Sequence, residues 1–571
     1  VYPDKYHYYE YDALSHLTKA YDERGWTYYT YDALSQLTRK EQPNAEALEF
    51  VYDKTGRRTY LNSSGGEVYY EYDAIGRMQK LQKQGASEAQ YEYDAANRLT
   101  KKTLGNGCYT YFAYDQANRI TQILSCKPES TPLAYFEYTY DAASRITQCQ
   151  REDGTVIYYG YDEASRLTSE DWYDNSMTPI YAFAWDYDAV GNRIYQKRGN
   201  QETYYTYDAG NALIQKHEPG TGYSYYQYDS RGNCTLIQEP DGNVYFTYNH
   251  ANLVTSIHHK TGAFNYFYYD SQLHRYAIED SNGLAYFTWD SNGLNLLAEK
   301  DASGNTTAQY THGYTPIQGI GSLVEAKKEV DSCTYYQYPI YDHRGTVVKL
   351  MDENGNVVGF YAYDAWGLSL YETQNGTTNR FGWQSNWIRL TDSSEGMLLS
   401  PIRIYLPKDG NFLQRDSNIR EFSPYHYAIN SPLIFCDSQG EMAELAIGAA
   451  YGTGAVTAVT GLAALLIAAA IVGLGIWIVD ELTKPVPDDP TIPSKEQETA
   501  KDEDQQCLEM SSHGKQNVMP SELERLQTSD EVKEYLNNKY PQDPKKREKL
   551  EKRWQKAKHI RPNRQSKEDK K

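Results

Sequence analysis

A ten-residue phrase that recurs about every 21 residues constrains the fold of this chain more than any other feature. A clear copy is the segment 91–100, which reads YEYDAANRLT. The aspartate of this phrase returns at positions 12, 32, 53, 73, 94, 115, 141, 162, 188, 208, 229, 270 and 290, and Asn249 fills the slot between 229 and 270. A fixed period sustained over this length is the signature of a repeat architecture.

Each repeat predicts one β-hairpin. The pattern Tyr-x-Tyr places two rings on the same face of a strand, because side chains alternate along a strand. The aspartate, with a glycine or asparagine three residues later, supplies turn chemistry, and Arg-Leu-Thr then begins a second strand. One hairpin cannot bury its aromatic face alone, whereas stacked hairpins can. We therefore expect a mainly β fold, a long antiparallel strip with laddered tyrosines that twists until it coils or closes.

The repeats resemble the YD repeats of the Rhs family, which includes the C components of Tc toxins and the shells of teneurins. The resemblance covers roughly residues 1–440 and becomes more specific toward the end of that range. It is carried there by residues 341–347 (YDHRGTV), 361–367 (YAYDAWG), 381–384 (FGWQ), 403–416 (RIYLPKDGNFLQRD) and 425–440 (YHYAINSPLIFCDSQG), which are similar to the last hairpins and the Rhs-associated core. The resemblance implies a hollow β-shell around a C-terminal polypeptide, often a toxin, which the shell itself cuts free in many members.

The resemblance also implies candidate catalytic residues. Tc-toxin members use two core aspartates as an aspartic-type autoprotease, and the matching positions here are Asp416 and Asp437. Such a site needs two carboxylates close enough to share a proton and activate water. Arg415 is the supporting candidate, because a neighbouring cation holds a carboxylate ionised. The cut would fall near residues 441–443, whereas in the alternative interpretation both aspartates are turn-formers in a plug that closes the shell.

The composition divides the chain into four predicted parts. The repeats occupy residues 1–300, the end of the shell and the core occupy 301–440, a hydrophobic segment occupies 441–483, and a linker with a basic α-helical region occupies 484–571. Residues 445–479 contain no charge, and this length exceeds the roughly 20 residues that cross a bilayer. This favours a membrane-spanning or translocation segment over the alternative, a segment buried inside the shell.

The net charge is also unevenly distributed. Residues 540–571 carry a net charge of +8, and the rest of the chain carries −28. An acidic shell with a basic tail indicates two modules with different partners, and nucleic acid is the candidate partner of the tail. Seven cysteines stand at no metal or redox spacing, so neither a metal nor a cofactor is expected.

The tail offers three catalytic candidates, His513, His559 and Arg561. A small nuclease uses a histidine as general base and a cation to stabilise phosphate. The alternative interpretation is that the basic helix is simply a solvated face and that each histidine has no special role.

Two functional hypotheses follow. In the first, the shell encloses, delivers and cleaves free a toxin or effector, with the chain's own C-terminal segment as cargo and a target membrane and delivery machinery as partners. In the second, the chain is a cell-surface adhesion or carbohydrate-binding protein anchored by residues 445–479. Both place the protein outside the producing cell or on its surface. The chain begins at Val1 inside a repeat, so we expect a further N-terminal part.

Overall fold

The computed structural model describes residues 7–43, 46–83, 86–291, 293–314, 322–330, 333–374, 379–384, 387–390, 396–416, 423–437 and 444–445, the last pair as backbone. The chain divides into two compact units, Val1–Leu482 and Thr483–Lys571, and all of the described residues belong to the first. The hydrophobic segment 445–479 and the predicted helical tail therefore lie outside the described residues, apart from the backbone of Leu445. Within the described residues, no helix is both long enough and apolar enough to cross a membrane.

Most of the described chain forms one sheet of 34 strands. Every strand pairs antiparallel with the strand that precedes it and the strand that follows it, from the pair β1–β2 to the pair β33–β34. The strands are β1 Tyr8–Tyr11, β2 Leu17–Asp22, β3 Gly25–Tyr31, β4 Leu37–Gln42, β5 Glu46–Tyr52, β6 Arg58–Ser63, β7 Gly66–Tyr72, β8 Met78–Lys83, β9 Ala86–Tyr93, β10 Leu99–Leu104, β11 Tyr109–Tyr114, β12 Ile120–Cys126, β13 Pro132–Tyr140, β14 Ile146–Arg151, β15 Val156–Tyr161, β16 Leu167–Tyr173, β17 Pro179–Tyr187, β18 Arg193–Arg198, β19 Gln201–Tyr207, β20 Leu213–Glu218, β21 Gly222–Tyr228, β22 Cys234–Glu239, β23 Gly242–Tyr248, β24 Val254–His258, β25 Phe264–Tyr269, β26 Arg275–Asp280, β27 Gly283–Trp289, β28 Leu296–Lys300, β29 Thr306–His312, β30 Leu323–Val330, β31 Cys333–Tyr341, β32 Val347–Met351, β33 Val357–Tyr363 and β34 Ser369–Gln374. The predicted antiparallel strip of hairpins is confirmed.

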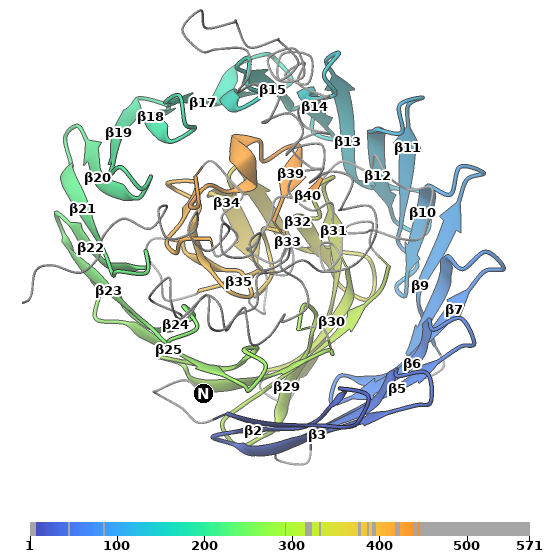
Figure 1. Cartoon of the computed structure of the whole chain (residues 1–571). Coiled ribbons are helices and arrows are strands. Elements are labelled where there is room, and N and C mark those ends of the chain that lie inside the picture. The colour runs from blue at the N-terminus through green and yellow to red at the C-terminus, as the bar shows by residue number, and fades with distance from the viewer. Residues whose placement is uncertain are drawn as a thin grey trace, which may run out of the picture. The chain divides into compact units, whose positions relative to one another are not determined.

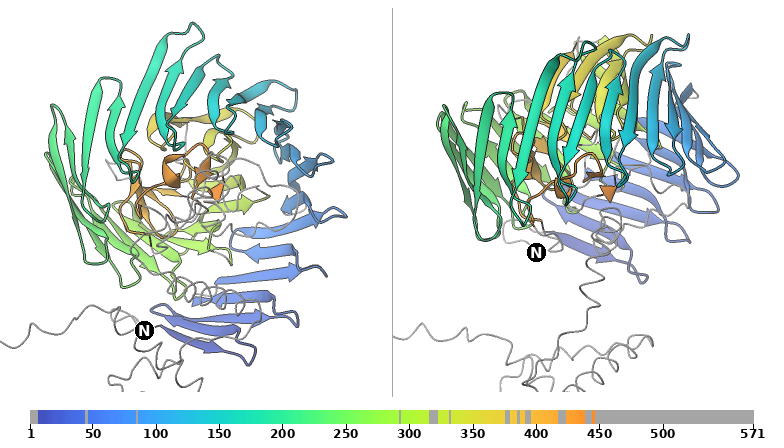
Figure 2. Two further views of the ribbon diagram at one scale, coloured as in Figure 1. Left: turned by 45° about the horizontal axis from the view of Figure 1, so that its top comes forward. Right: turned by 90° about the horizontal axis from the view of Figure 1, so that it is seen from above.

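The strip curls so that its last strands, β30–β34, lie inside the curve of the earlier ones (Figures 1 and 2). Side chains join the two layers. Lys83 on β8 pairs with Glu325 on β30 at 3.3 Å, and Glu170 on β16 accepts a hydrogen bond from the backbone N–H of Ala365 at 2.7 Å. Strand pairing among the described residues does not close the sheet into a barrel, so the overlap depends on such side-chain contacts.

The repeat aspartate builds the turn of each hairpin, as the sequence predicts. Asp94 Oδ1 accepts hydrogen bonds from the backbone N–H groups of Ala96 and Arg98, each at 2.9 Å. Asn97 lies between them at φ 66°, a left-handed conformation that asparagine tolerates well. Burial opposes the effect, but the backbone and guanidinium of Arg98 lower the pKa of Asp94 below its usual value. The turn thus holds an ionised carboxylate at neutral pH.

The second tyrosine of each repeat binds the preceding repeat. Tyr114 donates a hydrogen bond from its hydroxyl to the carbonyl oxygen of Leu99 at 2.8 Å. The same bond recurs along the strip, from Tyr31, Tyr52, Tyr72, Tyr93, Tyr161, Tyr207, Tyr228 and Tyr248 at 2.7–3.0 Å. The tyrosine ladder is therefore a ladder of hydrogen bonds as well as of rings.

The repeat arginine adds a second link between hairpins. Arg98 binds its own Asp94 through Nε at 2.7 Å and donates from Nη1 to Asn118 in the next turn at 3.0 Å. Its guanidinium also lies 4.8 Å from the centre of the Tyr114 ring, within the range of a cation–π contact. One arginine thus contacts the turn of its own repeat and both the turn and the tyrosine of the next.

The residues after β34 form small sheets inside the curve (Figures 1 and 2). One sheet contains β35 Ile388–Arg389, β36 Leu398–Leu399, β37 Ile404–Leu406 and β38 Asn411–Phe412, and a second contains β39 Phe435–Cys436 and β40 Glu444–Leu445. The 3-10 helix η2, Ala428–Asn430, lies between them in the sequence. Trp366, Trp383, Trp387, Tyr405 and Tyr427 are all at most 1% exposed and form the aromatic core of this inner part.

The tyrosine bond gives a direct test of the repeat mechanism. We expect Tyr114→Phe to lower the free energy of unfolding by about 1 kcal/mol, because it removes one hydrogen bond to a carbonyl and leaves the ring in place. Tyr158→Phe is the matched control, since Tyr158 projects from the outer face. Urea-unfolding midpoints measure both changes. Equal midpoints for the two variants would show that the hydroxyl does not connect the repeats.

Candidate functional site

The two aspartates implicated by the sequence meet inside the curled strip. Asp416 follows β38 and Asp437 directly follows β39, and the structure brings both to Arg403, which precedes β37. Arg403 Nη2 lies 3.1 Å from Oδ2 of Asp416 and 3.1 Å from Oδ2 of Asp437. The two carboxylate oxygens are therefore no further apart than twice that distance.

The Asp416–Arg403–Asp437 cluster is buried. The three side chains are only 3–5% exposed. The guanidinium of Arg403 stacks 3.6 Å from the centre of the Phe412 ring, and its Nη1 donates to the carbonyl oxygen of Pro424 at 3.3 Å. The backbone N–H of Asp416 donates to the same carbonyl at 2.9 Å, which fixes the carboxylate beside the arginine.

One cation shared by two buried carboxylates constrains the chemistry of the cluster. Taking three charges out of water is costly, and the attraction to Arg403 offsets the repulsion between the two aspartates. The buried Nε of Arg403 has no hydrogen-bond acceptor within the described part of the chain. The cluster thus combines two acids or bases with a donor that is free to bind a carbonyl oxygen.

The chain between the two aspartates is strained. Ala428, Ile429 and Asn430 have φ values of 50°, 52° and 59°, three consecutive left-handed residues. This conformation is unfavourable for a β-branched residue such as Ile429 and persists only when its surroundings impose it. Asn430 donates from Nδ2 to the carbonyl oxygen of Gly191 at 2.7 Å, which ties this turn to the wall of the strip.

Arg415 occupies a different place from Arg403. Its side chain is exposed, and its backbone N–H donates to the carbonyl oxygen of Gly232 at 3.2 Å. Gly232 has a φ of +86°, and a Cβ there would approach Arg415 to 3.0 Å, so glycine is needed for this approach. Sequence analysis did not assign a role to Arg403, although this residue opens the core motif 403–416 and could have been found there.

The predicted cleavage region is bracketed by a strand pair. Residues 441–443 lie outside the described residues, as do the tail candidates His513, His559 and Arg561. On either side of this gap, Phe435 pairs with Leu445 and Cys436 pairs with Glu444. Glu444 therefore lies beside Cys436, the neighbour of Asp437 in the sequence, so the chain after Asp437 comes back to the same place.

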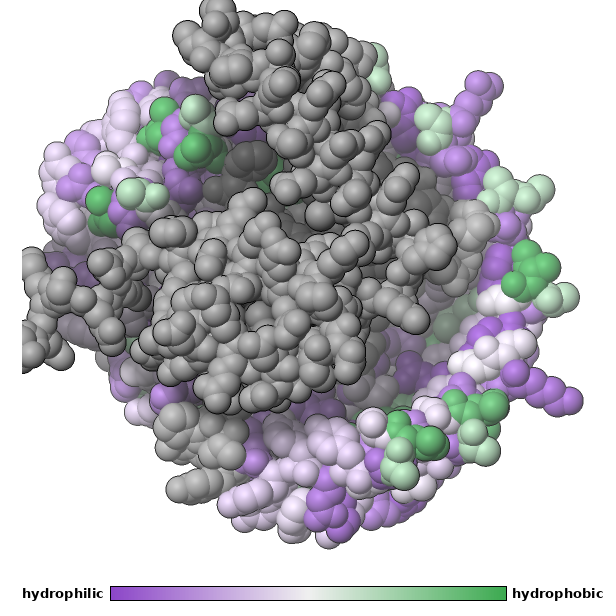
Figure 3. Space-filling model, viewed as in Figure 1, coloured by the Kyte–Doolittle hydropathy of each residue, from purple (hydrophilic) through white to green (hydrophobic). Residues whose placement is uncertain are grey.

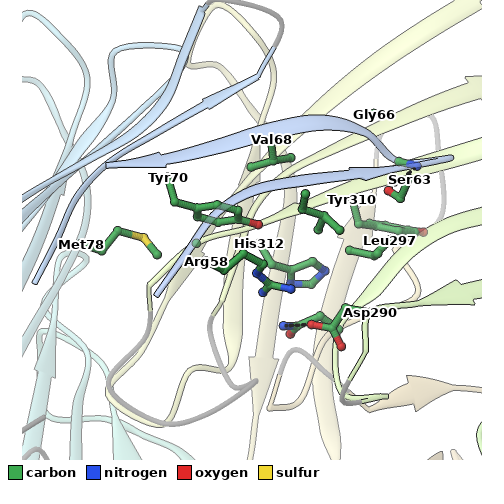
Figure 4. A pocket seen from close by; sticks show the side chains of 14 residues that line it. Arg58, Ser63, Gly66, Val68, Tyr70, Met78, Asp290, Leu297, Tyr310 and His312 are labelled. Atoms are coloured by element: carbon green, nitrogen blue, oxygen red, sulfur yellow. Dashed lines mark hydrogen bonds between the residues drawn. The ribbon is translucent and has the colours of Figure 1, made fainter. Parts of the chain in front are cut away.

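Some cavities of the first unit lie away from this cluster. A cavity of about 70 Å³ lies between strands β6–β8 and β27–β29, where Arg58, Asp290 and His312 approach one another (Figure 4). Burial lowers the pKa of His312 to about 4, so its ring is neutral at pH 7. Both ring nitrogens are bonded, to Leu296 O at 2.7 Å and to Ser322 Oγ at 2.8 Å, which indicates a structural role.

The second cavity, of about 340 Å³, lies between strands β20–β24 and the inner sheets. Two of the cations that line it are paired, Lys216 with Asp409 at 3.4 Å and Lys260 with Glu239 at 2.6 Å. Among the described residues, no group of histidine, cysteine, aspartate and glutamate side chains is arranged to hold a metal ion.

Comparison with known proteins gives partial matches. No family model matches the chain. Over 170 residues, 28% of this chain and 7% of the relative, the sequence is 27% identical to the tRNA nuclease WapA of Bacillus subtilis (strain 168). Over 139 residues, 24% of this chain and 4% of the relative, it is 29% identical to salivary gland surface protein 1 of Aedes aegypti. The chain thus spans less than a tenth of the length of these curated relatives.

Among solved structures, the complex TcdB2-TccC3-TEV aligns with 76% of this chain and 27% of that chain, at 15% sequence identity and a TM-score of 0.44. A TM-score of 0.44 does not establish a common fold. The fold class of the present chain rests on its own strand pairing.

The shared arginine makes a testable prediction about stability. We expect Arg403→Ala to lower the free energy of unfolding by about 3–5 kcal/mol, because it leaves two buried carboxylates without their cation. Adding Asp416→Asn to this variant removes one of the opposed charges and is expected to restore part of the loss. Urea unfolding of the single and double variants measures the coupling. Additive effects would contradict a charge cluster shared by these side chains.

Proposed function

We propose that this chain forms a YD-repeat shell around its own C-terminal polypeptide and that the Asp416–Arg403–Asp437 cluster cleaves that polypeptide free. The observation that supports this proposal best is the convergence of both predicted aspartates on one guanidinium, inside the curve of the strip. Two aspartates acting only as separate turn-formers would have no reason to share a buried cation.

The proposed reaction is hydrolysis of a peptide bond, with water as the only co-reactant. One carboxylate takes a proton from water as the oxygen attacks the carbonyl carbon, and the carboxyl group then returns this proton to the leaving nitrogen. The second carboxylate positions the water. The free Nε–H of Arg403 donates a hydrogen bond to the carbonyl oxygen, where negative charge develops.

The strand pair β39–β40 supports the position of the cut. Because Cys436 pairs with Glu444, residues 438–443 connect two points that lie side by side, directly after Asp437. The connection is too short to reach far from the cluster, since each residue spans at most about 3.6 Å. We therefore propose residues 441–443 as the substrate of the cluster.

The fate of the released polypeptide is a further part of the proposal. Residues 445–479 would enter a target membrane after release, and the basic tail would act on nucleic acid in a competitor or host cell. The relative WapA of Bacillus subtilis is a tRNA nuclease, and we propose the same class of activity for the tail. Exit from the producing cell would require delivery machinery or a further N-terminal part.

The cleavage proposal predicts the mass of the purified protein. We expect the unmutated chain to show a break near residues 441–443 in denaturing intact-mass analysis, with both pieces co-purifying under native conditions. Asp416→Asn and Asp437→Asn are each expected to leave the chain whole, because one carboxylate cannot act as both base and positioning group.

Asp409→Asn is the matched control for these variants. Asp409 is equally buried and ion-paired, but it contacts Lys216 and Tyr226 outside the cluster. It should cleave as the unmutated chain does, once thermal unfolding confirms that it is folded. An unmutated chain that stays whole, or cleavage that survives both cluster variants, would overturn the proposal.

The tail proposal has a separate readout. We expect the released polypeptide to degrade tRNA in a gel assay and expect His513→Ala or His559→Ala to abolish this activity, because each removes a candidate general base. Arg561→Ala should weaken the activity, because it removes a phosphate contact. A released tail without activity on tRNA would refute this part and leave the shell and cleavage proposals intact.

A further inference from the structure

One arginine of the strip is buried without an acidic partner. Arg151, at the end of β14, is 7% exposed, and it makes no ion pair or side-chain hydrogen bond with any other described residue. Hydrophilic side chains cover much of the outer surface seen in Figure 3, where water solvates them. Arg151 lacks that access, and charged side chains are almost never buried this deeply unless they are paired.

Three aromatic rings lie near the guanidinium of Arg151. Its central carbon is 5.7 Å from the ring centre of Phe136, 5.5 Å from that of Trp172 and 5.8 Å from that of Phe360. All three distances are close to the 6 Å limit of a cation–π contact, so the rings offset only part of the cost of burying the charge. None of the rings carries a negative charge, so the guanidinium still needs a counter-ion.

The side chain of Arg151 lines a cavity of about 40 Å³ between the wall of the strip and its inner layer. Strands β13–β16 supply one side of this cavity, and residues 342–348 with β33 supply the other, which lies inside the curve in Figure 1. A cavity of this size has room for only a few water-sized species. The space therefore restricts a ligand to a small inorganic species that contacts both layers.

The other ionisable side chains around this cavity do not neutralise Arg151. Arg344 binds Asp342 through Nε at 3.0 Å and through Nη2 at 2.8 Å, so these two charges cancel. Burial raises the pKa of the Cys149 thiol to about 12 and lowers the pKa of His343 to about 4, so both side chains are neutral at pH 7. The described lining therefore carries one net positive charge, that of Arg151.

The hydroxyl of Tyr138 supplies a second donor. Tyr138 lines the same cavity, is 4% exposed and donates to no acceptor in the described part of the chain. Burial raises the pKa of this phenol well above its usual value, so it keeps its proton at neutral pH. The guanidinium and the phenol together present only donors, which is the arrangement that an anion satisfies.

We propose that the cavity beside Arg151 and Tyr138 binds one small inorganic anion of the halide class, with chloride as the physiological ligand. The anion would accept charge-assisted hydrogen bonds from the guanidinium and one hydrogen bond from the phenol. Ordered water would satisfy the same donors but would not neutralise the charge. Because β13–β16 lie on one side and β33 on the other, the anion would help to hold the inner hairpins against the wall, independently of the cleavage cluster.

The test is thermal unfolding of the full chain in chloride, bromide and gluconate salts at equal ionic strength, which keeps general screening constant. A ligand that binds only the folded protein lowers the unfolding equilibrium constant about 100-fold when its concentration is about 100 times its Kd. We therefore expect the unfolding midpoint to rise with chloride or bromide until the site is full, and gluconate, which is too large for the cavity, to lack this effect. In crystals grown with bromide, anomalous scattering should place one bromide ion beside Arg151.

Three variants assign the effect to this cavity. Arg151→Met should remove the chloride response, because it keeps the length of the side chain and removes the charge. Tyr138→Phe should weaken chloride affinity by about tenfold, because it removes one hydrogen bond to a charged ligand. Arg145→Met is the matched control, since Arg145 lies in the same hairpin but binds Asp141 at 2.6 Å. It should respond to chloride as the unmutated chain does.

Three results would overturn the inference: equal midpoints of the unmutated chain in all three salts, a chloride response that persists in folded Arg151→Met, or no bromide ion in the cavity. If Arg151→Met does not fold, unchanged chloride affinity of Tyr138→Phe would overturn it as well. Cleavage near residues 441–443 is measured separately by intact mass and should be the same in all three variants, so the two proposals fail separately.

Discussion

The hydroxyl of one tyrosine, donated to a carbonyl oxygen one repeat earlier, is the interaction on which the rest of the structure depends. A β-hairpin in isolation is marginal, and pairing along strand edges leaves a long strip free to bend. The bond from Tyr114 to Leu99 joins hairpin bodies, and Arg98 joins the turn of one repeat to the turn and the ring of the next. With about 1 kcal/mol for each such hydrogen bond, the many copies along the strip define a single curvature.

That curvature creates the interior. Because the strip curls until β30–β34 lie inside earlier strands, contacts such as Lys83 with Glu325 connect residues far apart in the sequence. The inner sheets then pack within a wall that already exists, and Asn430 reaches that wall at Gly191. The position of Arg403 between Asp416 and Asp437 thus depends on the repeats, although none of the three residues belongs to one.

The sequence predicted the local structure better than the site. Period, turn chemistry and tyrosine alternation were sufficient for the antiparallel strip, because each depends on residues close together in the chain. The roles of Arg98 and of the Tyr114 hydroxyl were not predicted, since they appear only when two hairpins are stacked. The two aspartates were found through the resemblance to a known family, but the role of Arg403 was not. The motif shows that residue 403 is an arginine, but it does not show that the side chain points toward the two aspartates. Arg415, the nearer arginine in sequence, lies at the surface.

The two-residue pairing of β39 with β40 has a mechanical consequence. A cut within residues 441–443 would break the covalent chain but leave Glu444 and Leu445 held against Cys436 and Phe435 by backbone hydrogen bonds. The cleaved polypeptide would then remain bound to the shell until mechanical force or a change of solvent separates strands β39 and β40. Cleavage would make release possible, and the strength of the two residue pairs would determine when the polypeptide leaves the shell.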